Sequence, residues 1–169
     1  MTILPYKDIL PKIHDSVWIA DNSVVAGDIE IGEDSSVWFG VQMRGDVHEI
    51  RIGERTNIQD NAVVHVTRNV SGTYIGDDVT VGHGAILHAC RVEDKCLIGM
   101  GAIVLDEAVI EEGAMVAAGA LVTPRKVVKS GQLWGGNPAR YMRDLTDEEN
   151  AFLSVSADNY VRLSKEYKD

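Results

Sequence analysis

The feature that most constrains this chain is an aliphatic residue that returns every six positions, with three exceptions, from Ile13 to Val122. An amphipathic helix would repeat its apolar residues at three and four positions, and a half-buried strand at two. A period of six with small residues near the apolar one is typical of a hexapeptide β-helix. The repeated residues are Ile13, Ile19, Val25, Ile31, Val37, Met43, Ile52, Ile58, Val64, Ile75, Val81, Leu87, Val92, Ile98, Val104, Ile110, Val116 and Val122.

The repeat predicts an all-β solenoid, a parallel β-helix of about six coils with three hexads in each coil. Residues 1–12 contain Pro5 and Pro11 and form an irregular lead-in, and the pattern dissolves after Pro124 into a Gly- and Pro-punctuated strap. We therefore expect residues 1–143 to form the β-helix with its lead-in and strap. Residues 144–169 are expected to form a C-terminal helix that packs on it, and the length of 169 residues fits one domain.

The C-terminal helix has a clear start signal. Thr146 is followed three residues later by Glu149, which predicts a capping box. The residues expected to pack on the β-helix share one face at helical spacing: Phe152, Val155, Asn159 and Leu163, with Tyr160 and Tyr167 at its edge. A buried Asn needs a polar partner. Either a loop carbonyl supplies it, or Asn159 and Tyr160 reach a polar site on a neighbouring subunit.

Charge and composition exclude several kinds of partner. The 16 basic and 26 acidic residues leave a net charge of −10, which disfavours nucleic acid and an anionic membrane surface. No apolar run approaches the roughly 20 residues of a membrane helix, and the N-terminus does not resemble a secretory signal. Cys90 and Cys96 are expected to be inert core thiols in a reducing compartment. The cytoplasm is therefore the expected location.

Counting hexads places two histidines next to each other. Because three hexads make one coil, Leu87 is expected to stack directly above Val64. His65 and His88 each follow one of these residues, so they should lie one above the other at about 4.7–4.9 Å, the spacing of neighbouring strands. The same count places Arg44 below His65.

A third histidine falls on another edge of the coil. Ile58 should lie below Val81, which places Asp60 under His83. Three histidines with an open position are the ligand set of a catalytic zinc ion. His65 and His88 can share one ion, whereas His83 is expected to reach such an ion only from a neighbouring chain. This predicts a homotrimer with metal sites at its interfaces; the alternative is that these are surface or packing histidines.

Several motifs together resemble the gamma-class carbonic anhydrase family over nearly the whole chain. They are Arg44-Gly45-Asp46, Asn57-Ile58-Gln59-Asp60, His65, Gly82-His83, His88, the segment Asn137 to Arg140, and Asn159-Tyr160. The resemblance implies a left-handed β-helix in a homotrimer. It also implies Zn²⁺, or alternatively Fe²⁺ or Co²⁺, held by His65 and His88 of one subunit and His83 of the next.

The implied reaction is the reversible hydration of CO₂ to bicarbonate, with a small-molecule substrate and no nucleic acid or membrane partner. A zinc-bound water has a pKa of about 7 and supplies hydroxide at neutral pH. Gln59 is expected to bond that water, and Asp60 to orient Gln59 or hold a liganding imidazole. Arg44 and Asp46 are expected to form an ion pair between subunits. Further site candidates are Asn57, Asn159 and Tyr160.

One departure from the family pattern bears on activity. The best-known relatives carry a glutamate for proton export directly after the Asp of the first motif and another on an acidic loop. Here Val47 occupies the first position, and the loop before Ile75 contains no acid. The hydration reaction is therefore expected to be slow or to use another relay. Two alternatives stay open: an acyl-CoA-linked hexapeptide transferase or thioesterase, and a metal-bearing scaffold trimer with weak catalysis.

Overall fold

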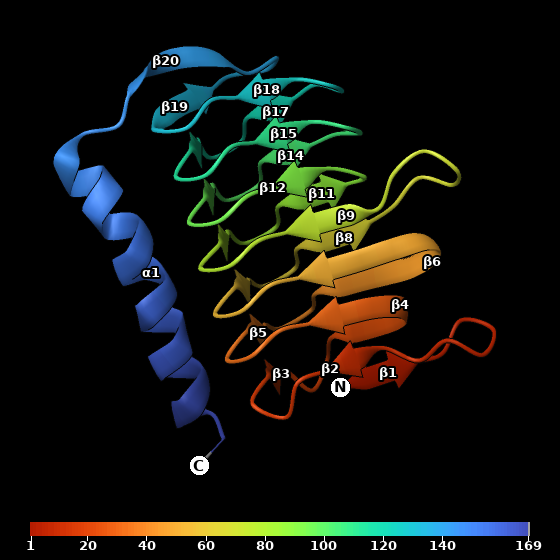
Figure 1. The fold of residues 1–169 in the computed structure, drawn as a ribbon. Coiled ribbons are helices and arrows are strands. Elements are labelled where there is room, and N and C mark those ends of the chain that lie inside the picture. Colours follow the sequence, from red (N-terminus) through yellow and green to blue (C-terminus); the bar gives the residue numbers. More distant parts are fainter. Residues whose placement is uncertain (169) are drawn as a thin grey trace.

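The computed structural model describes residues 1–168 and shows a parallel β-helix of about seven turns with one C-terminal helix (Figure 1). Each turn contributes one short strand to each of three flat faces, so the predicted fold class is confirmed. The first strand and the end of the C-terminal helix lie near the same end of the solenoid, because the helix runs back along it (Figure 1). No helix in the described residues is long and apolar enough to cross a membrane.

The three faces stack strands from successive turns in parallel. The first face contains β1 (Thr2–Leu4), the starts of β4 (Val24–Ile31) and β6 (Gln42–Ile52), β8 (Val63–His65), β11 (Ile86–His88), β14 (Ile103–Val104) and β17 (Leu121–Val122). The second face contains β2 (Lys12–Ile13), the ends of β4 and β6, β9 (Thr73–Ile75), β12 (Arg91–Val92), β15 (Val109–Ile110) and β18 (Val127–Val128).

The third face differs because its last strand turns back. It contains β3 (Trp18–Ile19), β5 (Ser36–Val37), β7 (Asn57–Ile58), β10 (Thr80–Val81), β13 (Leu97–Ile98), β16 (Met115–Val116), β19 (Gln132–Gly135) and β20 (Arg140–Asp144). Only the β19–β20 pair is antiparallel among these neighbouring strands. The helix lies along the outside of this face (Figure 1).

The solenoid is about one turn longer than the six coils expected. At its start, β1 pairs with β4 and places Ile3 beside Val25, so the lead-in supplies a strand. At its end, Val128 stacks on Ile110 and Trp134 on Val116. The six-residue step therefore continues past Pro124, because proline is compatible with the turn between strands. The strap begins after this last strand rather than at Pro124.

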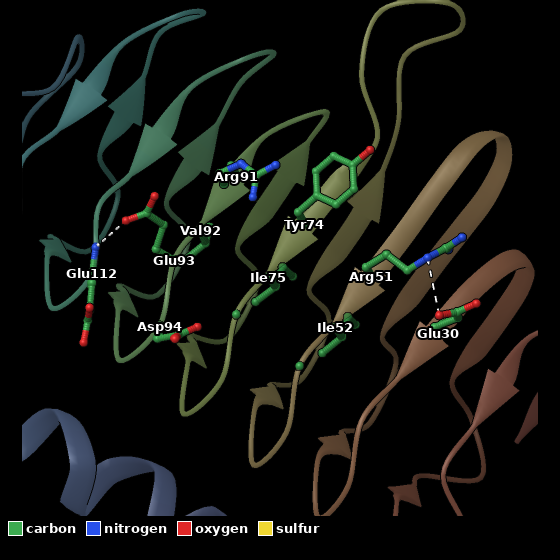
Figure 2. A pocket seen from close by; sticks show the side chains of 12 residues that line it. Glu30, Arg51, Ile52, Tyr74, Ile75, Arg91, Val92, Glu93, Asp94 and Glu112 are labelled. Atoms are coloured by element: carbon green, nitrogen blue, oxygen red, sulfur yellow. Dashed lines mark hydrogen bonds and ion pairs between the residues drawn. The ribbon is translucent and has the colours of Figure 1, made fainter.

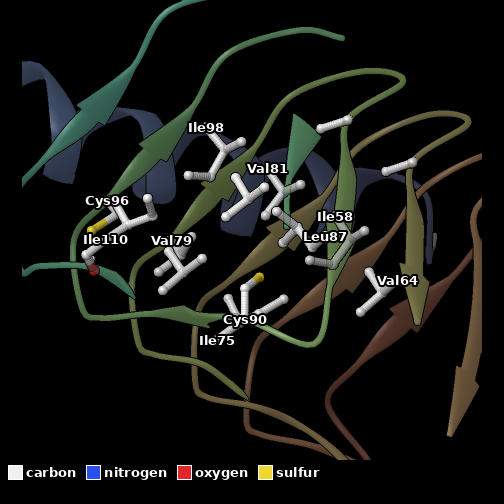
Figure 3. Packing of buried hydrophobic residues seen from close by; sticks show 14 of the residues in the cluster. Ile58, Val64, Ile75, Val79, Val81, Leu87, Cys90, Cys96, Ile98 and Ile110 are labelled. Atoms are coloured by element: carbon white, nitrogen blue, oxygen red, sulfur yellow. Dashed lines mark hydrogen bonds between the residues drawn. The ribbon is translucent and has the colours of Figure 1, made fainter. Parts of the chain in front are cut away.

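The aliphatic residues of the repeat fill the interior. Their side chains point inward from the three faces and pack as one column (Figure 3). Burial of this column removes apolar surface from water, which is the main force that stabilises the coil. Cys90 and Cys96 are buried and free in this core, as predicted. Burial raises the pKa of each thiol to about 12, so both stay protonated at neutral pH.

The C-terminal helix, α1 (Asp147–Glu166), begins with the predicted capping box of Thr146 and Glu149. The predicted packing face is wrong. Phe152, Val155, Asn159 and Leu163 are exposed, and the residues that face the solenoid are Leu153, Ser156, Ala157, Val161 and Ser164. Small side chains let the helix approach the flat third face closely, and the Ser156 hydroxyl bonds Thr80 at 2.8 Å. Packing on a flat sheet therefore selected the small residues rather than the large apolar ones.

Candidate metal centre

His65 and His88 lie on neighbouring coils at the corner where the first face ends. They are paired residues in the register of β8 and β11, which confirms the predicted stack. Nδ1 of His65 is 3.2 Å from Nε2 of His88. Two ligands of a tetrahedral zinc ion with bonds of about 2.0–2.1 Å are separated by about 3.3 Å. The donor atoms and their spacing therefore fit a shared metal ion.

His83 lies at the opposite border of the first face, in the turn after β10. Its Nδ1 is 2.8 Å from Oδ2 of Asp60, which confirms that Asp60 stacks below it. This bond leaves Nε2 of His83 free, and nearly half of the side chain is exposed. Within residues 1–168 of one chain, no group of three His, Cys, Asp or Glu side chains is gathered in a way that could hold a metal ion.

Asp46 connects the histidine pair to Arg44. Its Oδ1 is 3.2 Å from Nε2 of His65, and its Oδ2 accepts a hydrogen bond from Arg44 of the same chain. The expected ion pair between subunits is thus already formed within one chain. Burial raises the pKa of Asp46, but the bonds from Arg44 and His65 outweigh it and leave that pKa below its usual value. Burial lowers the pKa of His65, and the bond to Asp46 only partly offsets this effect.

Gln59 belongs to a row of buried polar side chains that runs from the third face to the helix. Its Nε2 donates to Oδ1 of Asn57 at 3.0 Å, and Nδ2 of Asn57 donates to Oγ1 of Thr80 at 3.1 Å. Thr80 in turn bonds Ser156 of α1. Asn57 therefore fixes the orientation of the Gln59 amide. Of the two roles expected for Asp60, the structure shows the bond to a histidine.

The two helix residues predicted for the site lie in different environments. Tyr160 packs edge-on against Trp38, with ring centroids 5.3 Å apart. Burial and the nearby carboxylate of Asp60 raise the pKa of Tyr160. Asn159 is exposed and accepts a hydrogen bond from Arg162. Within one chain, therefore, only Tyr160 lies beside the predicted site residues.

A pocket of about 440 Å³ on the second face contains none of the predicted site residues (Figure 2). Arg51 points toward Glu30 in it, while Tyr74 donates to Glu49 and lies under the guanidinium of Arg91. A second pocket, of about 410 Å³, lies between the third face and α1. It is mainly apolar and lined in part by Gln59, His83, Tyr160, Met100, Met115 and Phe152. The smaller pocket is thus the one that adjoins His83.

Sequence reasoning missed two residues that contact the histidine pair. Oδ1 of Asp106 is 2.8 Å from Nδ1 of His88, and Oδ2 accepts a 2.5 Å bond from Thr67. Burial raises the pKa of Asp106, but these two bonds outweigh it, so its pKa is lowered overall. The repeat contained the signal, because Val104 stacks on Leu87 and Asp106 follows in the turn above.

The outward side of the first face is mainly apolar. Its outward residues from β4 to β17 are Val24, Gln42, Val63, Ile86, Ile103 and Leu121, all at least partly exposed, so the polar Gln42 interrupts the aliphatic row once. On the second face, the outward residues of the lower turns are Lys12, Glu30, Arg51, Tyr74 and Arg91. The first face therefore carries an exposed, mainly aliphatic strip between its two histidine borders, whereas the lower turns of the second face carry charges and its upper turns Val109 and Val127.

Comparisons with known proteins identify the family of this chain. The hexapeptide-repeat family described as "Bacterial transferase hexapeptide (six repeats)" matches residues 11–45. Gamma carbonic anhydrase 2 of Arabidopsis thaliana, a mitochondrial protein, is 50% identical over 97% of this chain, which spans 61% of that relative. A carbonic anhydrase of Geobacillus kaustophilus is 46% identical over 98% of this chain and 91% of its own length.

A solved structure is similar throughout. The hexapeptide transferase family protein of Anaplasma phagocytophilum superposes with a TM-score of 0.95 at 48% identity, covering 98% of each chain. The chain spans only about three fifths of the length of the Arabidopsis relative. The name of that relative places it in mitochondria, so a cytoplasmic location for this chain stays a prediction. The 46% identity to the Geobacillus protein extends over nearly the full length of both chains, and together with the hexapeptide repeat it shows the family of this chain. The chain belongs to the gamma-class carbonic anhydrase-like family of hexapeptide-repeat proteins.

Proposed function

We propose that this protein is a zinc-dependent carbonic anhydrase that works as a homotrimer and hydrates CO₂ reversibly to bicarbonate. The observation that carries the proposal is the placement of the three histidines. His65 and His88 form a close pair at one border of the first face, and His83 lies at its other border. Around a three-fold axis, the lone histidine of one subunit meets the pair of the next.

The aliphatic strip of the first face supports the trimer. Exposed apolar residues gathered on one face are typical of a protein interface. The strip ends at the two histidine borders, so an interface formed there brings both borders together. The exposed helix residue Phe152 lines the pocket that adjoins His83, so it lies beside one border of this contact.

The chemistry divides between the metal and the chain. Zinc, when bound, supplies a Lewis acid that lowers the pKa of its water to about 7. Carboxylates of the chain orient the imidazoles: Asp60 accepts a hydrogen bond from His83, and Asp46 accepts one from His65. Gln59 donates its amide N–H to Asn57, which leaves its carbonyl oxygen as a free acceptor for a substrate hydroxyl. Fe²⁺ and Co²⁺ suit the same donor set and are part of the test.

Proton export is expected to limit the rate. Val47 cannot carry a proton, and the loop from Arg68 to Gly72 contains no acid. A small buffer such as imidazole can remove the proton instead of a side chain. We therefore expect the turnover number to rise with buffer concentration, whereas kcat/KM changes little.

The test is stopped-flow CO₂ hydration on protein purified without oxygen and loaded with Zn²⁺, Fe²⁺ or Co²⁺. We expect a rate above buffer for the wild type and a buffer-level rate for His88→Gln. A metal-replete trimer with no rate above buffer contradicts the proposal. The likeness to a hexapeptide transferase family protein favours acyl transfer as the second candidate, so the same sample is offered acyl-CoA substrates.

A further inference from the structure

We infer that Asp106, held by Thr67, is a positioning residue that keeps the proton of His88 on Nδ1 and turns Nε2 toward His65. The purpose of this arrangement rests on the proposed metal site, since a neutral imidazole binds a metal through its unprotonated nitrogen. The hydrogen bonds themselves do not depend on it. The role can therefore be tested in metal-free protein.

The bond from His88 to Asp106 decides which ring nitrogen carries the proton. An ionised carboxylate only accepts hydrogen bonds, so Nδ1 of His88, at 2.8 Å from Oδ1, must be the donor. A neutral imidazole has one N–H, so Nε2 is left with a free lone pair. That atom faces Nδ1 of His65 at 3.2 Å.

Thr67 occupies the second oxygen of the same carboxylate. Its hydroxyl donates to Oδ2 of Asp106 at 2.5 Å, so the two oxygens have different partners and the carboxylate is fixed against rotation. Thr67 lies two residues after His65, whereas Asp106 lies one coil above His88. The Thr67–Asp106 bond therefore connects the coil that contains His65 to the coil above His88.

The bond between Asp106 and His88 is the outer contact that typically orients a metal-binding imidazole. Removing such a contact usually weakens metal affinity by about 10- to 100-fold. Asp106→Ala should have this effect on zinc affinity, measured by competition with a chelator. Asp106→Asn keeps an oxygen that can accept the His88 N–H, so it should retain most of the affinity. Thr67→Val should produce a smaller loss, because the acceptor is kept but no longer fixed.

A second readout needs neither metal nor activity. In metal-free, ¹⁵N-histidine-labelled protein, nitrogen chemical shifts show which ring nitrogen is protonated, with His88 assigned from a His88→Gln sample. We expect the proton on Nδ1 in the wild type and in Asp106→Asn, and a mixture of both forms in Asp106→Ala. A purely structural role for Asp106 would lower the melting temperature without changing these shifts.

The matched control is Glu107→Ala, which removes the same charge from the neighbouring exposed residue, whose carboxylate pairs with Arg125 at 3.5 Å. It should leave both the tautomer and the zinc affinity unchanged. If Asp106→Ala keeps the wild-type shifts and binds zinc as Glu107→Ala does, the positioning role is wrong. A wild type without CO₂ hydration, but with the expected shifts and affinities, supports the positioning role and contradicts only the proposed function.

Discussion

The Nδ1 atom of His65 and the Nε2 atom of His88 face each other at 3.2 Å across two neighbouring coils of the β-helix. Strand pairing sets this distance, because His88 is directly opposite His65 in the register of β8 and β11. Stacking within one chain therefore brings together two of the three histidines of the proposed metal site. In the proposed trimer, His83 from the far border of a neighbouring subunit's first face would complete that site.

Replacing His83 with Ala should remove one metal ligand from all three sites of the proposed trimer. Two imidazoles bind zinc weakly, so the variant should lose metal during dialysis. Its melting temperature should fall, because a ligand stabilises only the form that binds it. The β-helix itself should persist, since the buried aliphatic column does not involve the metal. Metal analysis, circular dichroism and thermal unfolding measure these effects.

A matched control for this change is His14→Ala, which removes an exposed histidine that contacts Ser16. It should keep full metal content and the wild-type melting temperature. Should the His83 variant also retain one zinc per subunit, the placement of His83 on a neighbouring subunit's ion is wrong.

Replacing Ile103 with Glu should dissociate the proposed trimer. The side chain points outward from β14 on the first face and is only partly buried in one chain, so the change costs the single subunit little. In a trimer it would place a charge without a partner in an apolar contact. Val109→Glu makes the same change at the equivalent outward position of β15 on the second face and should leave the oligomer intact. Light scattering distinguishes the two; equal masses for both variants would rule out the first face as the interface.

The metal-free protein should lose stability as the pH falls below about 6.5, the ordinary pKa of histidine. Burial, partly offset by Asp46, leaves the folded-state pKa of His65 below that value, so the unfolded chain binds the proton more readily. Stability is therefore complete above pH 6.5 and decreases as the pH falls through the folded-state pKa. Urea unfolding between pH 5 and 8 measures this slope. His65→Gln should flatten it, and an unchanged slope would show that other groups cause it.

Replacing Ala157 with Leu should force α1 away from the third face. Ala157 is fully buried against the solenoid, and overpacking of this kind typically costs about 1–3 kcal/mol of unfolding free energy. Moving the helix also separates Ser156 from Thr80 and Tyr160 from Trp38. Ser154→Leu, an exposed change on the same helix, should have almost no effect. Equal unfolding midpoints in denaturant for the two variants would contradict the close packing of α1.

The sequence determined the coil and most of the register. A step of six with inward aliphatic residues admits few folds, and counting in threes placed His88 on His65 and Asp60 under His83. These relationships follow from the sequence because stacking in a solenoid is local: each residue lies next to its counterparts one coil away. The same count places Asp106 in the turn one coil above His88 but one residue beyond the position in register with it, so counting indicates the coil of Asp106 and not its bond to His88.

Tertiary structure decided what hexad counting does not describe. The helix packs through Ser156 and Ala157 rather than through Phe152, because small side chains let a helix approach a flat sheet closely. The six-residue repeat carries no information about which side of the helix does this. Arg44 bonds Asp46 within one chain because side-chain conformation, not register, sets that contact. Register places a residue on a face or at a corner, whereas the direction of its side chain depends on every neighbour that competes for the same space and the same hydrogen bonds.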